Sequence, residues 1–241
     1  MKEQAIDYKA GDVTCKGYLV YDESASGKRP GVIVVHEWWG HNEHTREAAR
    51  KVAQAGFVGL AVDLYGEGKQ APDPQTASQM SSEIGQNLPL LRERFNAARA
   101  ALEQQPAVDA SRIAAIGYCF GGMVVLQAAR AGEDLRGVVS FHGILQTGTP
   151  AQPGQVKAKV LVLTGDSDPF VPNDQVEAFE KEMKAAGVDY KLVKYAGGKH
   201  GFTNPAATER GKKFNLPLEY NADLDRQSWE EAVAFLRSVT Q

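Results

Sequence analysis

The sequence has few of the features that mark secreted proteins. Its 241 residues include only two cysteines, Cys15 and Cys119, which lie far apart and form no Cys-x-x-Cys pair. Such cysteine usage is typical of a reduced, cytosolic protein and not of a disulfide scaffold. The N-terminal segment 1–10 is polar and lacks the apolar stretch of a signal peptide. We therefore expect a cytoplasmic protein.

Long apolar runs and an excess of basic charge are also missing. The longest apolar runs, such as 32–35 and 160–163, have the length of strands, whereas a transmembrane helix needs about 20 residues. The net charge is −3 and no basic run is present, which argues against a nucleic-acid or membrane partner. The sequence has no heptad pattern and no exposed amphipathic extension that would indicate an obligate oligomer. We expect a monomer or a weak homodimer.

The pattern that is present alternates short β-branched runs with longer amphipathic stretches. This alternation predicts an α/β fold whose central sheet is mostly parallel, with about seven to eight strands and helices on both faces. The strands are expected at 4–9, 14–21, 31–36, 57–64, 113–117, 137–141, 160–164 and 190–195. The helices are expected at 42–54, 88–105, 120–131, 173–186 and 224–239.

The chain shows no repeat, low-complexity tract or linker, so we predict a single domain over residues 1–241. The first two strands are expected at the sheet's edge, as a hairpin around Gly11-Asp12. Segment 65–87 is polar and rich in turn residues, which predicts a long loop or small cap with room for one short helix. Loops of that length inside compact domains are usually functional. Segment 198–222 is expected to be irregular.

The most informative segment is Gly-x-Cys-x-Gly at 117–121, where a predicted strand passes directly into a predicted helix. Such a turn is sharp and strained, and it lifts the central side chain above the edge of the sheet. The glycines leave room for Cys119, and the helix N-terminus favours its thiolate. The N–H of Phe120 is a candidate oxyanion donor. The plainer alternative is a tight turn in which Cys119 is only a small buried hydrophobic residue.

A cysteine nucleophile needs a base, and the base needs an orienting acid. In this architecture the chain order is nucleophile, acid, histidine. That order favours His200 over His142, which ends the strand 137–141 ahead of any candidate acid and is expected to line the pocket. Asp166 and Asp168 compete as the acid in the loop after strand 160–164. Asp168 is favoured because it extends further from the strand.

The loop after strand 31–36 is expected to contribute two more groups. Its backbone N–H at Trp38 is a candidate second oxyanion donor. Glu37 follows the buried strand directly, and a carboxylate close to Cys119 would hold the resting thiol protonated. The alternative for Glu37 is a solvent-exposed loop carboxylate.

The same loop also invites interpretation as a metal site. His36, Glu37, His41 and His44 lie close together in sequence. Their spacing is not His-Glu-x-x-His, and no further ligand stands nearby to complete a tetrahedral set. We therefore predict no metal, and we expect His41 and His44 at the surface near a helix start.

Together these segments resemble the dienelactone hydrolases, also called carboxymethylenebutenolidases, over essentially the whole chain. The resemblance rests on segments 35–40, 117–122, 165–172 and 200–202. It implies an α/β-hydrolase fold and a triad of Cys119, Asp168 and His200. It also implies that Glu37 interacts with the resting thiol and is displaced when substrate binds. Members of this family hydrolyse enol-lactone or other ester bonds without a metal or organic cofactor.

The chain departs from that family where the substrate carboxylate is held. The dienelactone enzymes use two arginines, one in the cap and one shortly after the histidine. Here segment 65–87 contains only Lys69 as a basic residue, and none follows His200 before Arg210. Lysine does not replace a bidentate arginine without loss. The candidate pocket residues are aromatic or imidazole side chains: Trp39, Tyr65, Tyr118, His142 and Phe202.

The leading hypothesis is thus an enzyme that hydrolyses a small-molecule lactone or carboxylic ester through an acyl-thioester intermediate. A general carboxylesterase, or a hydrolase of another small acyl substrate, is an alternative with the same three residues. A hydrolase-like binding module without activity is the alternative from a different class. Loss of one residue of the triad would indicate such a module, and none is missing here.

Overall fold

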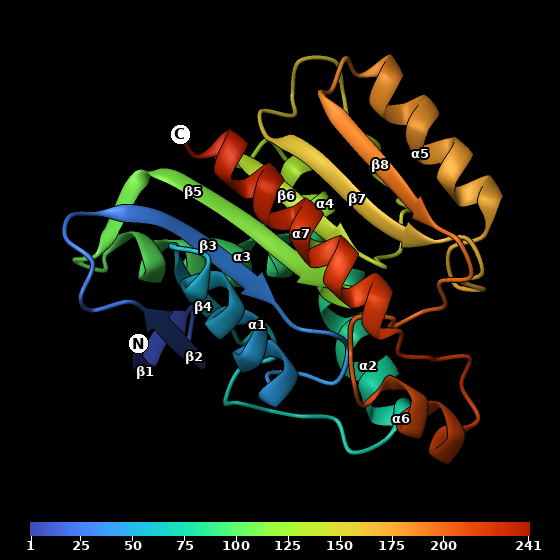
Figure 1. The fold of residues 1–241 in the computed structure, drawn as a ribbon, viewed down its shortest axis with the longest axis horizontal. Coiled ribbons are helices and arrows are strands. Elements are labelled where there is room, and N and C mark those ends of the chain that lie inside the picture. Colours follow the sequence, from blue (N-terminus) through green and yellow to red (C-terminus); the bar gives the residue numbers. More distant parts are fainter. The chain divides into compact units, whose positions relative to one another are not determined.

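The computed structural model describes residues 1–241 (Figure 1). It contains two compact units, residues 1–116 with Thr240 and residues 117–239 with Gln241. Strand β5 (Val108–Tyr118) runs from the first unit into the second. The cysteine at its end therefore belongs to the second unit. The expectation of a single domain over the whole chain stays a prediction.

The first unit contains five strands in the order β1-β2-β4-β3-β5. Besides β5 these are β1 (Lys2–Ala10), β2 (Val13–Tyr21), β3 (Arg29–Val35) and β4 (Val58–Val62). The predicted hairpin of β1 and β2 is confirmed, since the two strands pair antiparallel around Gly11-Asp12. The expectation that both are edge strands is wrong for β2, which also pairs antiparallel with β4. Strands β3 and β4 are parallel.

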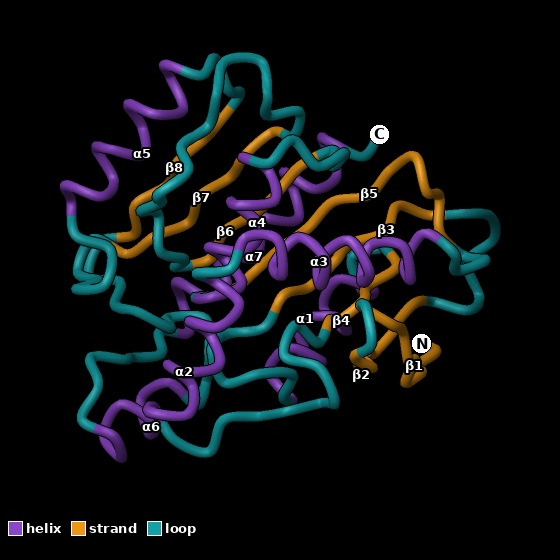
Figure 2. The backbone as a smooth tube through the Cα atoms, turned by 180° about the vertical axis from the view of Figure 1, so that it is seen from behind, coloured by secondary structure: helices purple, strands orange, loops and turns teal.

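Three helices belong to the first unit: α1 (Glu43–Gln54), α2 (Pro74–Gly85) and α3 (Leu88–Glu103). Gly31 pairs with Val58, and Gly59 pairs with the residue after Gly31. The two glycines therefore face opposite sides of the sheet. A Cβ on Gly59 would lie 2.7 Å from an Ala49 atom of α1, and one on Gly31 would lie 3.0 Å from Leu102 of α3. Helices α1 and α3 thus cover opposite faces, as Figures 1 and 2 show from the two sides.

The predicted loop or cap at 65–87 is mostly helix. Helix α2 begins after Asp73, whose side chain accepts a hydrogen bond from the Thr76 N–H at 2.8 Å, and proline occupies its first turn. Both features are typical of a helix start. Ahead of α2, the segment is held by a β-bridge between Gly40 and Gln70.

The second unit contains the end of β5 followed by three parallel strands in the order β6-β7-β8. These are β6 (Gly137–Phe141), β7 (Lys159–Gly165) and β8 (Tyr190–Tyr195), with helices α4 (Phe120–Arg130), α5 (Asn173–Ala185), α6 (Ala207–Phe214) and α7 (Ala222–Val239). A Cβ on Gly137 would lie 2.9 Å from Phe235 of α7, whereas one on Gly122 of α4 would lie 2.6 Å from Ser140. Since Gly137 and Ser140 face opposite sides of β6, helices α4 and α7 cover opposite faces.

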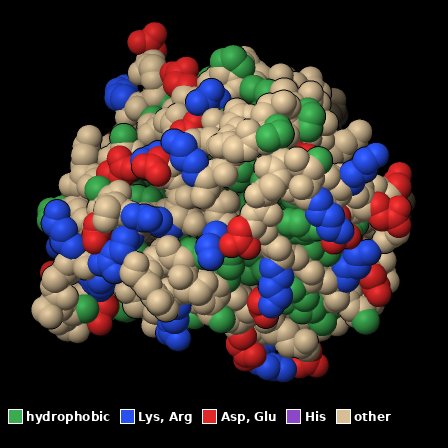
Figure 3. Space-filling model, turned by 90° about the horizontal axis from the view of Figure 1, so that it is seen from above, with side chains coloured by type: hydrophobic (Ala, Val, Ile, Leu, Met, Phe, Trp, Pro, Cys, Tyr) green, Lys and Arg blue, Asp and Glu red, His purple; other side chains and the backbone are tan.

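The prediction of a mostly parallel α/β fold with helices on both faces is confirmed, and the chain has eight strands. The expectation that 198–222 is irregular is wrong at α6. None of the helices combines the length and apolarity that a membrane crossing requires. Figure 3 shows acidic and basic side chains interspersed over one face, without a large patch of one sign.

Candidate active site

Cys119 lies in a strained backbone conformation between β5 and α4. Its φ is 52° and its ψ is −114°, a region that a residue with a Cβ adopts only when its surroundings impose it. The N–H of Cys119 donates to the carbonyl of Phe141 on β6 at 2.9 Å, and its own carbonyl accepts from the Met123 N–H at 3.2 Å. The cysteine therefore stands at the N-terminus of α4, with its side chain only half-buried.

Position 117, two residues before the cysteine, must be glycine because backbone atoms of α4 lie close to it. A Cβ on Gly117 would lie 2.0 Å from the carbonyl oxygen of Gly121 and 2.8 Å from the backbone nitrogen of Gly122. Backbone atoms of the first helical turn leave no room for such a group. The Gly-x-Cys-x-Gly segment thus forms the sharp strand-to-helix turn that its spacing predicts.

His200 and Asp168 form a buried pair on the loops that follow β8 and β7. The Nδ1 of His200 and the Oδ2 of Asp168 are 2.8 Å apart. The other carboxylate oxygen of Asp168 accepts the Phe170 N–H at 2.8 Å. With Nδ1 engaged, the Nε2 of His200 remains for Cys119, whose thiol lies in hydrogen-bonding contact with the imidazole. The structure therefore brings the side chains of Cys119, His200 and Asp168 together.

Electrostatics favour a charged imidazole at His200. Burial alone would lower its pKa, but the neighbouring Cys119 and the hydrogen bond to Asp168 together raise the pKa to about 10. A buried imidazolium is stable only beside compensating negative charge. The imidazole of His200 thus interacts with the Cys119 side chain and with the carboxylate that orients the ring.

Asp166, the competing acid, has a different set of contacts. Its Oδ1 accepts the Gly197 N–H at 2.8 Å and the Ser167 hydroxyl at 2.9 Å. Its own N–H donates to the carbonyl of Tyr195 at 3.0 Å. Asp166 therefore joins the loop after β7 to the loop after β8, and it is Asp168 that contacts His200.

The predicted pocket residues of the second unit form a cluster around His142, which itself packs on His200. The ring of His142 lies 5.2 Å from that of His200 and 5.2 Å from that of Phe202, and it packs against Tyr118 at 6.2 Å. His142 is buried, with a φ of 40°. Its Nε2 lies 2.8 Å from the hydroxyl of Thr203, a contact that sequence reasoning did not identify. No spacing rule relates these two residues, which come from different loops.

The predicted residues of the first unit form a group of their own. Glu37 is only 5% exposed, so the alternative of a solvent-exposed carboxylate is wrong, and its Oε2 lies 3.9 Å from the Nδ1 of His44. The Tyr65 hydroxyl donates to the carbonyl of Trp38 at 2.9 Å, and the rings of Trp38 and Trp39 are 5.0 Å apart. A contact between Glu37 and the thiol in the second unit stays a prediction, as does the oxyanion role of Trp38.

The expectation that His41 and His44 lie at the surface is wrong. His41 is 3% exposed and His44 is partly buried. His36 is fully buried, where its Nδ1 donates to the Glu37 carbonyl at 2.6 Å and its Nε2 accepts the Leu64 N–H at 3.3 Å. Burial lowers the pKa of His36 to about 4, so the ring is neutral at pH 7. No group of three or more His, Cys, Asp or Glu side chains is arranged to hold a metal ion.

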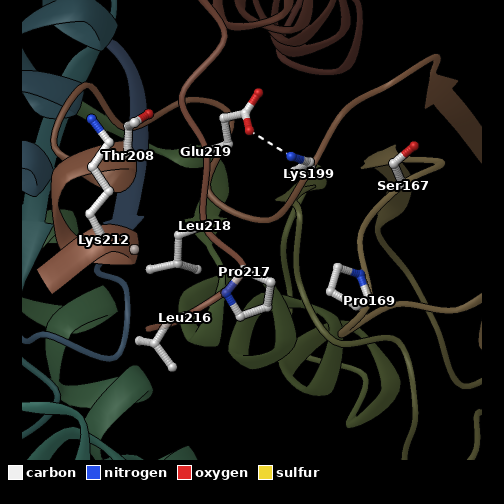
Figure 4. Close-up of a pocket in the computed structure, with 10 residues that line it drawn as sticks. Ser167, Pro169, Lys199, Thr208, Lys212, Leu216, Pro217, Leu218 and Glu219 are labelled. Carbon is white, nitrogen blue, oxygen red and sulfur yellow. Dashed lines mark hydrogen bonds and ion pairs between the residues drawn. The ribbon is translucent and has the colours of Figure 1, made fainter. Parts of the chain in front are cut away.

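A cavity of about 450 Å³ adjoins the loops that carry Asp168 and His200 (Figure 4). Ser167 and Pro169 flank the aspartate, and Lys199 precedes the histidine. The Lys199 ammonium group pairs with Glu219 at 2.6 Å across the cavity. The Glu219 N–H also donates to the carbonyl of His200 at 3.1 Å. This cavity lies beside the candidate site, and none of the three candidate catalytic residues lines it.

Comparison with known proteins identifies the family that this chain matches. Residues 15–240 match the model of the dienelactone hydrolase family. A crystal structure titled as a dienelactone hydrolase-like promiscuous phosphotriesterase from metagenomic libraries has a TM-score of 0.92 and 34% identity, covering 100% of this chain and 99% of that chain.

Two curated relatives are similar over most of their length. A Bradyrhizobium protein named "Probable 2-oxo-3-(5-oxofuran-2-ylidene)propanoate lactonase" is 33% identical over 188 residues, which cover 73% of this chain and 75% of that protein. Protein usf of Aquifex pyrophilus is 28% identical over 239 residues, which cover 97% of each chain.

Proposed function

The chain belongs to the dienelactone hydrolase family, and from that premise we propose that it cleaves a small lactone or carboxylic ester with Cys119 as nucleophile, His200 as base and acid, and Asp168 as the group that orients the histidine. The family supplies the reaction class, which is hydrolysis of ester or lactone bonds. The roles of the three residues rest on their geometry.

One observation carries the proposal. A cysteine in a strained turn, at a helix N-terminus, lies in contact with a buried imidazole that is itself 2.8 Å from a buried carboxylate. The helix N-terminus and the imidazolium both stabilise a thiolate, and the carboxylate fixes the tautomer and orientation of the ring. A cysteine that only fills space needs none of these contacts.

The reaction then runs in two steps. The thiolate of Cys119 attacks the carbonyl carbon, the carbon–oxygen ester bond breaks, and the leaving oxygen takes the proton from Nε2 of His200. This leaves an acyl-thioester and a neutral imidazole. Water then gives a proton to His200 as its oxygen attacks the thioester carbon. Breaking of the carbon–sulfur bond releases the acid and restores the thiolate–imidazolium pair.

Two backbone groups and one carboxylate complete the proposal. The N–H of Phe120 is the proposed first oxyanion donor, because it directly follows the nucleophile at the N-terminus of α4, where the helix dipole favours negative charge. The N–H of Trp38 would be the second donor. Glu37, buried two residues after β3, would hold the thiol protonated in the resting enzyme, so that the reactive thiolate–imidazolium pair forms only when substrate displaces this carboxylate.

The substrate is proposed as a small neutral or weakly anionic lactone or ester. The Bradyrhizobium relative is named as a lactonase, which supports a cyclic ester as one natural class. The chain lacks arginine in 65–87 and has none between His200 and Arg210. We therefore expect weaker recognition of a substrate carboxylate than an arginine pair would provide.

The test is hydrolysis of 4-nitrophenyl acetate and of a dienelactone by the wild type, Cys119→Ala and Cys119→Ser. We expect the wild type to hydrolyse the aryl ester, to lose activity on alkylation with iodoacetamide, and to be inactive as Cys119→Ala. Cys15 is buried and burial raises its pKa, so Cys15→Ala is the matched control and should remain sensitive to alkylation. Undiminished turnover by Cys119→Ala would contradict the proposed nucleophile.

A second candidate activity is phosphotriester hydrolysis at the same site. It is favoured by the relative with 34% identity over the whole chain, which is titled as a promiscuous phosphotriesterase. Attack of the same thiolate on phosphorus would give a phosphorylated cysteine and release an aryloxide. Incubation with paraoxon, with release of 4-nitrophenolate and the mass of Cys119 followed together, tests it. A single burst without further turnover would limit the reaction to covalent inhibition.

A further inference from the structure

Phe170 is unusual among the large apolar side chains of this protein because it is exposed. Its exposed fraction is 38%, and Met1 is the only other large hydrophobic residue that is comparably open to solvent. An isolated apolar residue at a surface needs no special explanation. The position of Phe170 does need an explanation, because its ring lies against the imidazole of His200. The ring centroids are 4.9 Å apart and the interplanar angle is 71°.

The backbone holds Phe170 in this place from both sides. Its N–H donates to the Oδ1 of Asp168 at 2.8 Å, so the same carboxylate binds the histidine and the phenylalanine. Its carbonyl accepts from the side-chain amide of Gln175, on α5, at 3.3 Å. The ring is therefore fixed beside the imidazole while one part of its surface remains open.

The chemistry of the histidine identifies the part of the substrate that meets this ring. To protonate the leaving oxygen, Nε2 of His200 must lie about 2.6–3.2 Å from it. The substituent on that oxygen consequently stands next to the imidazole. A side chain packed on the imidazole is therefore a candidate to contact that substituent rather than the acyl chain on the other side of the carbonyl.

We propose that Phe170 is a specificity-determining residue that binds the leaving-group side of the substrate and favours esters whose leaving oxygen carries an aromatic group. The inference rests on the proposed function of Cys119 and His200. It adds a preference within that reaction class for aryl esters, whose planar leaving groups pack edge-to-face on a phenyl ring.

The test compares two acetates that give the same acetyl-enzyme, phenyl acetate and 2,2,2-trifluoroethyl acetate. Their intrinsic reactivities differ equally for all variants, so the ratio of the two kcat/KM values isolates binding of the leaving group. We expect Phe170→Ala to lower the ratio of phenyl to trifluoroethyl acetate about fivefold, mainly through KM, because an aromatic pair contributes that order of selectivity. Phe170→Tyr keeps the ring and should retain most of the ratio.

Phe214→Ala is the matched control, because Phe214 is a partly exposed phenylalanine at the end of α6; this variant should keep the wild-type ratio. An equal loss on both acetates in Phe170→Ala would mean that the ring only supports His200, and an unchanged ratio would mean that it contacts no leaving group. Either result overturns the inference. Cys119→Ala is assayed in parallel. If Cys119→Ala stays active, the proposed function fails. If Cys119→Ala is inactive and Phe170→Ala keeps the wild-type ratio, only the role of Phe170 fails.

Discussion

At the scale of single residues, two opposed effects set the pKa of His200. Burial favours the neutral ring, whereas Cys119 and Asp168 favour the charged one and raise the pKa to about 10. Removal of the sulfur takes away a large part of the stabilising charge. We therefore expect Cys119→Ala to lower the pKa of His200 well below 10, as measured by NMR titration of the imidazole resonances.

The same balance sets the pH dependence of the free enzyme. The pair reacts as thiolate and imidazolium, so kcat/KM of the wild type should fall as pH rises through about 10, where His200 loses its proton. Asp166→Asn is the control and should keep the wild-type pH dependence of kcat/KM, because the Asp166 carboxylate does not contact the imidazole. An imidazole pKa that is unaffected by Cys119→Ala would show that the thiol does not carry the charge that the pair requires.

The two aspartates of the loop after β7 separate an orienting role from a structural one. Asp168→Asn would favour the wrong tautomer of His200, and we expect kcat to fall by about a thousandfold or more. Asp166→Asn retains an oxygen that can accept the Gly197 N–H, so its activity should stay within about threefold of the wild type. Steady-state kinetics on 4-nitrophenyl acetate measure both. A larger loss in Asp166→Asn than in Asp168→Asn would reverse the assignment.

The sequence could predict that these residues lie at the ends of strands of one sheet, and it favoured Asp168 over Asp166 only by its distance from the strand. Chain order favours His200 over His142 because the fold fixes the sequence of loops. Asp166 and Asp168 are two residues apart in one loop, and only the backbone path decides which side chain turns toward the imidazole. Thr203 was missed for a similar reason, since its contact with His142 joins two loops. The catalytic roles of these residues stay predictions.

At the scale of elements, the turn from β5 to α4 depends on the absence of a side chain at one position. A Cβ on Gly117 would lie 2.0 Å from a backbone oxygen of the first turn of α4. Backbone cannot yield as a flexible side chain does. We expect Gly117→Ala to lower the free energy of unfolding by about 3 kcal/mol or more, as measured by urea denaturation, and to abolish activity.

Gly148 provides the matched control for that variant. Nothing lies within 4 Å of a Cβ at this position, and its φ is not in the left-handed region. Gly148→Ala should therefore be neutral or raise the free energy of unfolding by up to about 1 kcal/mol, because alanine restricts the unfolded chain. If Gly117→Ala unfolds at the wild-type urea concentration, the turn is less tightly constrained than this geometry requires.

The elements that sequence patterns predicted best are the ones buried on both faces. The strands β3, β4, β6 and β7 are nearly continuous apolar runs, which is typical of parallel strands between helix layers. Helix α6 was missed because half of its eight residues are charged and its buried face is formed by small residues, Ala207 and Gly211, which give only a weak apolar signal. Its Gly211 also resembles a turn residue, although it is needed because a Cβ there would lie 2.7 Å from the carbonyl of Leu218.

At the scale of the whole molecule, the stability of the fold should depend on pH through groups whose protonation changes on unfolding. The pKa of His36 is lowered by burial from 6.5 in the unfolded chain to about 4 in the folded protein. The unfolded chain therefore binds a proton on this ring below pH 6.5 while the folded protein does not. The stabilisation is fully present above pH 6.5 and is lost as pH falls through about 4.

Tyr195 has the opposite effect at high pH. Burial raises its pKa to about 12, so its contribution is fully present below pH 10 and is lost as pH rises from 10 through 12. These two groups alone would leave the free energy of unfolding constant between about pH 6.5 and 10, whereas His200, with its pKa raised to about 10, should make it fall as pH rises through this window. Each group acts in its own unit, His36 in the first and Tyr195 in the second.

The acidic limb of that profile can be assigned to His36 by a substitution that keeps its hydrogen bonds. The amide of His36→Gln can donate to the Glu37 carbonyl and accept the Leu64 N–H, the two contacts that the imidazole makes, but it does not titrate. Because folding lowers the pKa of His36 from 6.5 to about 4, the wild type should lose about 3 kcal/mol more than His36→Gln between pH 7 and pH 4. Urea denaturation at intervals across this range measures the difference. Parallel profiles for the two proteins would mean that the buried ring accepts a proton without unfolding, through a local opening of the loop that follows β3.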